Sequence, residues 1–215
     1  SPKAEELEIV FHGYDAFFSS LKDTPAISVL AALAISIVVC GDFENRTTQL
    51  KIVVGYHRAP IFFSKLIAAA AANVILLLPY VLGRTVLQSV LLGFGHPFTV
   101  EAAANMAAAF FAAVLTGIAI NGITFILAFL LRKTVLVVAA GFCLVLLGGN
   151  ALVSFGVSTP WFGRLLANTP LGLLRAMDAA AYAPAMVGKA FSISMVWIAA
   201  FALLTCRIFQ KAELK

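Results

Sequence analysis

The chain has 215 residues, of which 62% are hydrophobic and 12% are charged, and its mean hydropathy is +1.01. Soluble domains carry about 25% charged residues and much less apolar mass, so this composition excludes an ordinary soluble protein and predicts an integral membrane protein. The formal net charge is +5. Because the surplus of Lys and Arg falls in a few segments between apolar stretches, it indicates membrane topology rather than binding to nucleic acid.

The first 25 residues are polar, with five acidic residues against two lysines. Their apolar residues follow helical spacing, as in the set Val10, Tyr14, Phe17 and Phe18. Together with the excess of acids, this pattern predicts an external amphipathic segment over residues 1–25, at the outer surface of the membrane. A flexible tether is compatible with the same composition.

Five long apolar stretches predict an all-α polytopic membrane bundle with five transmembrane helices. The stretches cover residues 26–43, 61–94, 101–131, 134–157 and 189–209. We expect a single transmembrane domain over residues 1–215 in the cytoplasmic (inner) membrane, with the C-terminus in the cytoplasm, because basic residues gather on that side. The second stretch is longer than one crossing needs, so we expect it to tilt, to break near Pro79 or to project beyond the bilayer.

The segment over residues 42–65, DFENRTTQLKIVVGYHRAPIFFSK, is a long polar interruption between two apolar stretches. Its charged residues are Asp42, Glu44, Arg46, Lys51, Arg58 and Lys65. Charges this dense cannot lie in hydrocarbon, and the excess of cations places them on the cytoplasmic face. We predict a short surface helix, a turn at Gly55 and a new helix with Pro60 in its first turn. The alternative is a basic loop that only sets topology.

The order of residues in this segment resembles the cytoplasmic element of the bacterial ABC-2 type permease family. The matching residues are Glu44, Asn45, Thr47, Lys51, Gly55, Arg58, Ser64 and Lys65. Two positions depart from the family pattern: His57 replaces the usual Ser, and Arg46 stands where Gly is common. Neither departure removes the positive, amphipathic character of the segment.

The resemblance implies a transport subunit whose energy comes from ATP hydrolysis by a separate protein subunit. It implies that this element docks on a separate ATP-binding cassette subunit, which holds ATP and Mg, and that a second permease copy or a related permease completes the transporter. A further helix ahead of Ser1 would give the six spans of the family. The ATPase-coupling residues implied are Glu44, Asn45, Thr47, Lys51, Gly55, His57, Arg58 and Lys65, with Lys51 and Arg58 expected to pair with acids on the ATPase.

Polar residues on one face of the 61–94 stretch form a second candidate site. Asn73, Tyr80, Arg84 and Gln88 recur at intervals of seven, four and four residues. Such a stripe either lines a translocation path or makes hydrogen bonds between packed helices, and Arg84 could simply reach the outer surface. Asn150 follows two glycines that weaken the fourth stretch, so it joins the candidate path.

Other chemistry is missing from the sequence. It contains no G-x-x-x-x-G-K-[ST] motif, so ATP hydrolysis is not expected in this chain. The three histidines are far apart, and no set of residues predicts a metal site, a bound cofactor or an enzyme active site. Residues 158–188 contain three prolines and predict an external segment that could cover an outer mouth.

Two functions follow as hypotheses. The first is the permease subunit of an ATP-driven ABC-2 type exporter for a small molecule, peptide or lipid-like substrate. The second is a non-transporting membrane scaffold or immunity protein whose 42–65 segment recruits a cytoplasmic partner. An intramembrane enzyme is a third, weaker hypothesis.

Overall fold

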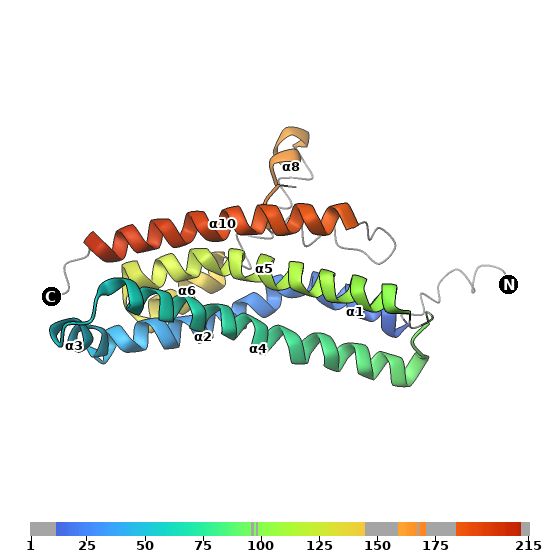
Figure 1. Ribbon diagram of the computed structural model, residues 1–215, viewed down its shortest axis with the longest axis horizontal. Coiled ribbons are helices and arrows are strands. Elements are labelled where there is room, and N and C mark those ends of the chain that lie inside the picture. The colour runs from blue at the N-terminus through green and yellow to red at the C-terminus, as the bar shows by residue number, and fades with distance from the viewer. Residues whose placement is uncertain are drawn as a thin grey trace.

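The computed structural model describes residues 12–95, 97, 99–144, 159–166, 168–170 and 184–211, and these form helices joined by short turns, with no strand among them (Figure 1). The helices are α1 (Gly13–Lys22), α2 (Thr24–Glu44), α3 (Thr47–Val53), α4 (Arg58–Leu92), α5 (Val100–Leu131), α6 (Thr134–Phe142), α8 (Pro160–Leu166) and α10 (Pro184–Lys211).

Four of these helices are long and apolar enough to cross a membrane: α2, α4, α5 and residues 187–210 of α10. The predicted all-α polytopic membrane bundle is therefore confirmed. Of the expected fifth span, α6 covers the first part, whereas residues 145–157, including Asn150, lie outside the described residues. The expected external segment over residues 158–188 is described in part, over residues 159–166, 168–170 and 184–188, and its other residues lie outside the described ones.

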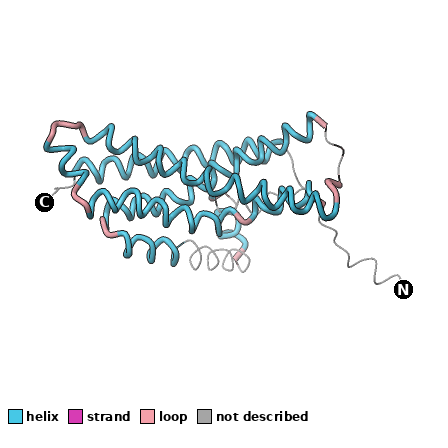
Figure 2. The backbone as a smooth tube through the Cα atoms, turned by 90° about the horizontal axis from the view of Figure 1, so that it is seen from below, coloured by secondary structure: helices cyan, strands magenta, loops and turns pink. Residues whose placement is uncertain are grey.

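Most of the connections gather at the two ends of the bundle, whereas the junction of α1 and α2 lies partway along α4 (Figures 1 and 2). One end, called here the α3 end, contains α3, the turn between α5 and α6, and the C-terminal end of α10. The opposite end contains the start of α1 and the connection between α4 and α5. The predicted short helix, the turn at Gly55 and the helix that carries Pro60 in its first turn are all present at the α3 end.

Helix α4 is unbroken through Pro79, and its 35 residues reach about 52 Å at a rise of 1.5 Å per residue. The hydrocarbon core of a bilayer is about 30 Å thick, so α4 is longer than a straight crossing needs. Helices α1 and α2 follow one another along it. Gly13 and Tyr14 donate backbone hydrogen bonds to Gly93 and Phe94, at 3.0 and 3.1 Å, which fixes the start of α1 beside the end of α4.

Helix α1 has the predicted amphipathic pattern, but it does not lie apart from the bundle. Phe17, Phe18 and Leu21 are buried with Leu77 and Val81 of α4, in a cluster that also includes alanines of α5. These alanines let α5 approach α1 closely, as small residues do between membrane helices. The apolar face of α1 therefore packs against protein.

A second core lies toward the α3 end and is built mainly from aromatic rings. The centroids of Phe129 and Phe209 are 5.1 Å apart, and those of Phe62 and Phe125 are 5.8 Å apart, with Phe43 packed against the first pair. The rings come from α2, α4, α5 and α10, so this cluster holds four helices together next to α3. Edge-to-face pairs of this kind contribute about 0.5–1.5 kcal/mol each beyond the area they bury.

Candidate functional site

The α3 element is bounded by two residues with positive φ. Arg46, between α2 and α3, has a φ of +59°, and Gly55, after α3, has a φ of +102°. L-residues with a side chain pay for this region of backbone space, whereas Gly does not. Gly55 thus permits the predicted sharp turn. Arg46 makes its turn at a conformation that favours Gly, the residue common there in the family that the segment resembles.

Apolar side chains of α3 and its following turn point away from the protein. Val53 and Val54 are 83% and 76% exposed, and Leu50 and Tyr56 are exposed as well. We call these four residues the α3 surface. On the other side of the helix, Thr48 is buried and Ile52 packs against the aromatic core. Helix α3 is therefore anchored by one face while its other face is uncovered in this chain.

Beside the α3 surface, Asp42 interacts with two lysines. Lys65 Nζ donates a hydrogen bond of 2.8 Å to the Asp42 carboxylate and another of 3.2 Å to the carbonyl oxygen of Val38. Its side chain is only 4% exposed, so the ammonium group depends on these partners. Lys51 Nζ lies 3.7 Å from the same carboxylate but is about half exposed. Lys65 joins α2 to α4, and Lys51 joins α3 to α2 more loosely.

Two further charged side chains connect this element to distant helices. Glu44 Oε1 accepts a hydrogen bond of 2.7 Å from the backbone N–H of Thr134, the first residue of α6. Arg58 Nη1 donates to the carbonyl oxygens of Phe209 and Gln210, at 3.0 and 2.8 Å, in the last turn of α10. A carboxylate at a helix N-terminus and a guanidinium at a helix C-terminus both complement the helix dipole.

The structure places all eight predicted coupling residues at the α3 end. Four of them hold the chain to itself through the contacts above: Glu44, Lys51, Arg58 and Lys65. The other four shape the backbone, at the ends of α2 and α3, in the turn and at the start of α4: Asn45, Thr47, Gly55 and His57. Within this chain, Lys51 and Arg58 both have internal partners. Their expected pairing with acids of another subunit stays a prediction.

The polar stripe of α4 divides into two parts. Asn73 is buried and accepts a hydrogen bond of 3.0 Å from Asn121 of α5. Tyr80 and Arg84 instead contact Asp23, at the junction of α1 and α2; the Tyr80 hydroxyl donates a hydrogen bond of 2.7 Å to its carboxylate, and the Arg84 guanidinium forms an ion pair with it.

The predicted hydrogen bonds between packed helices are thus present at these residues. Gln88 is half-buried further along α4, and Asn150 lies outside the described residues. A translocation path along the stripe stays a prediction.

Some partners at the α3 end could not be found from the sequence. Thr134, Phe209 and Gln210 interact with the coupling element across 90 to 152 residues of chain, through their backbone groups. Backbone atoms leave no mark in side-chain patterns. By contrast, Asp42 and Lys65 are both recognisable as charged residues in the sequence, although their pairing with each other was not predicted.

The chain matches no protein-family model, and no curated protein is found to be similar to it. The functional interpretation of the α3 end therefore comes from its own residues and from the resemblance of the 42–65 segment described above.

Proposed function

We propose that this chain is the membrane-spanning subunit of an ATP-driven ABC-2 type exporter. A separate ATP-binding cassette subunit would dock on the α3 surface from the cytoplasm, and a second permease copy would complete the path for a small molecule, peptide or lipid-like substrate. The observation that carries the proposal is the α3 surface itself, in which Leu50, Val53, Val54 and Tyr56 are exposed together at the tip of the bundle.

The chemistry around the α3 surface supports a protein partner. Apolar centres with polar rims are typical of protein interfaces, and aromatic anchors such as Tyr56 often contribute much of the binding energy. Arg46, Lys51 and His57 are exposed and lie next to the apolar residues in the chain, so they would favour an acidic rim on the partner. The same excess of cations favours a cytoplasmic position, which is where an ATPase subunit would bind.

The contacts of the element explain how docking would act on the membrane helices. Glu44 holds the start of α6, Lys65 joins α4 to α2 through Asp42, and Arg58 holds the last turn of α10. Glu44 ends the helix before α3 and Arg58 begins the helix after it, so displacing α3 would act through them on the ends of α6 and α10. Transport needs two global states with different contacts at the docking site, and such a shift would supply the connection between them.

Affinity purification of the tagged full-length chain from its native membranes, followed by an ATPase assay on the eluate, tests the proposal. We expect an ATP-hydrolysing subunit to co-elute. If the partner that co-elutes hydrolyses no ATP, the chain is instead a membrane scaffold or immunity protein that uses the same surface. If the chain elutes alone, the docking role is wrong.

A further inference from the structure

A pair of asparagines lies deep in the apolar bundle, at about half the thickness of a bilayer from the α3 end. Asn121 stands ten residues before the last residue of α5, which corresponds to about 15 Å along the helix. The hydrocarbon core is about 30 Å thick, so this depth is close to its middle. Asn73 of α4 lies opposite, and the side chains of Asn73 and Asn121 are only 5% and 2% exposed.

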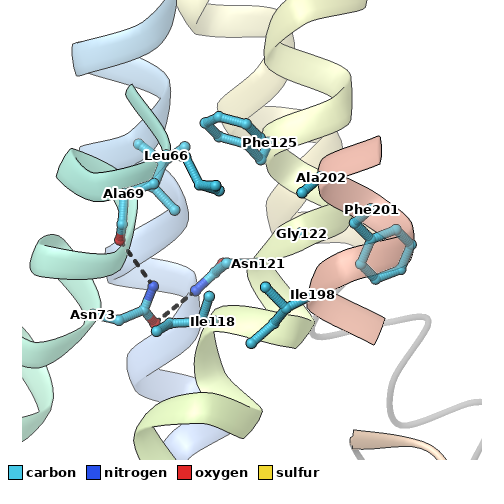
Figure 3. Close-up of a pocket in the computed structure, with 11 residues that line it drawn as sticks. Leu66, Ala69, Asn73, Ile118, Asn121, Gly122, Phe125, Ile198, Phe201 and Ala202 are labelled. Carbon is cyan, nitrogen blue, oxygen red and sulfur yellow. Dashed lines mark hydrogen bonds between the residues drawn. The ribbon is translucent and has the colours of Figure 1, made fainter. Parts of the chain in front are cut away.

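The two amides are hydrogen bonded to one another but not fully satisfied. Asn121 Nδ2 donates to Asn73 Oδ1 at 3.0 Å, and Asn73 Nδ2 donates to the carbonyl oxygen of Ala69 at 3.2 Å (Figure 3). Asn121 Oδ1 is fully buried, and no donor from the described residues reaches it. A side-chain amide has two donor hydrogens and an acceptor with two lone pairs, so the pair has further capacity for hydrogen bonds. Buried polar atoms of native proteins normally use that capacity, with protein or water as partner.

A cavity of about 20 Å³ lies beside the pair. Leu66 and Phe125 line it from α4 and α5, while Ile198, Phe201 and Ala202 of α10 line another side (Figure 3). This volume is sufficient for one water molecule.

Helix α10 packs tightly over this region. A Cβ atom on Gly122 would lie 2.4 Å from the ring of Phe201, so the missing side chain of Gly122 allows the ring to seat against α5. Phe201 and its neighbours on α10 therefore form one wall of the cavity, and access to it from that side requires a displacement of α10.

We propose that this cavity is a binding site for a single internal water molecule. The water donates a hydrogen bond to Asn121 Oδ1 and accepts one from the second N–H of Asn73 Nδ2, which satisfies the buried carbonyl. The site places a hydrated polar point near the middle of the bundle. The water site is inferred from side-chain geometry alone and does not depend on the transport function proposed above.

Proton-detected solid-state NMR of the full chain in lipid bilayers, labelled with ¹⁵N-asparagine, tests the proposal. We expect a cross peak between water and the side-chain NH₂ of Asn73, although that group is buried. Asn45, which is exposed at the α3 end, gives the reference signal for bulk water. Absence of a water cross peak at Asn73, with the Asn45 signal present, would overturn the proposal.

Two variants of Ala202 locate the water without changing either asparagine. Ala202→Val fills the cavity, so the water cross peak at Asn73 should disappear while the Asn73–Asn121 hydrogen bond remains. Ala202→Gly leaves the space open and should keep the cross peak. A cross peak that persists in Ala202→Val would place the water elsewhere and contradict the assignment.

Discussion

The two ends of the bundle differ in how their charged side chains are paired. Toward the opposite end, at the junction of α1 and α2, Asp23 interacts with Tyr80 and Arg84, and α1 is covered along its length by protein. At the α3 end, Arg58 and Glu44 hold the ends of other helices, while the apolar face of α3 is left exposed. The opposite end also exposes apolar side chains, such as Val90, Leu91 and Val100. The α3 end differs in that its exposed apolar residues lie on a short helix bordered by exposed cations, and it is there that the proposed partner would dock.

Removing Asp42 should have the largest effect on stability. Asp42→Ala leaves the buried ammonium of Lys65 without its carboxylate, and because the Asp42 side chain is itself partly exposed, we expect a cost of about 2 kcal/mol, below that of a fully buried pair. Thermal unfolding in lipid nanodiscs would measure the loss. Lys51→Ala is the control, because its ion pair is solvated and contributes less than about 1 kcal/mol. Equal losses of thermal stability in both variants would show that the burial of Lys65 does not set the cost of removing its ion pair.

Changing Arg58 should loosen the last turn of α10 and disturb coupling. In Arg58→Glu the carbonyl oxygens of Phe209 and Gln210 lose their donor and face a carboxylate instead, at a cost of about 2 kcal/mol. Hydrogen exchange over residues 205–211 should become faster, and ATP hydrolysis should be uncoupled from transport without unfolding. Arg58→Lys keeps the charge and should show a smaller effect. Unchanged transport in Arg58→Glu would exclude a coupling role for this charge.

At the junction of α1 and α2, the corresponding charge change should act only locally. Asp23→Asn removes an ion pair with Arg84 that is partly exposed, so we expect a loss of about 1 kcal/mol or less. Hydrogen exchange should rise in α1 and remain as before in α3. If this variant also weakened the binding of a partner at the α3 end, the two ends would not be separate in function.

The smallest effect concerns the turn before α3. Arg46→Gly relieves the positive φ of that position and should raise stability by less than about 1 kcal/mol. Arg46→Ala removes the same charge but keeps the backbone cost, so it should give no such gain in thermal unfolding. A similar gain in both variants would point to the charge rather than to the backbone.

The sequence predicted the elements better than their contacts. Four of the five predicted apolar spans, the turn at Gly55 and the helix beginning before Pro60 all depend on local residue patterns, and they are present in the described part of the chain. The packing of α1 was not predictable, since an amphipathic pattern does not tell whether the apolar face meets lipid or protein. The bonds of Arg58 and Glu44 join segments far apart in the chain through backbone atoms, for which side-chain patterns give no signal.

The most direct measurement compares ATPase co-purification for the unaltered chain, Val53→Glu and Val53→Leu. Val53 is highly exposed, so all three should unfold at nearly the same temperature. We predict that the unaltered chain and Val53→Leu retain the ATPase, whereas Val53→Glu places a carboxylate at the centre of the interface and weakens binding by at least about thirtyfold. Full retention of the ATPase by Val53→Glu, or its absence from the unaltered chain, would contradict docking on the α3 surface.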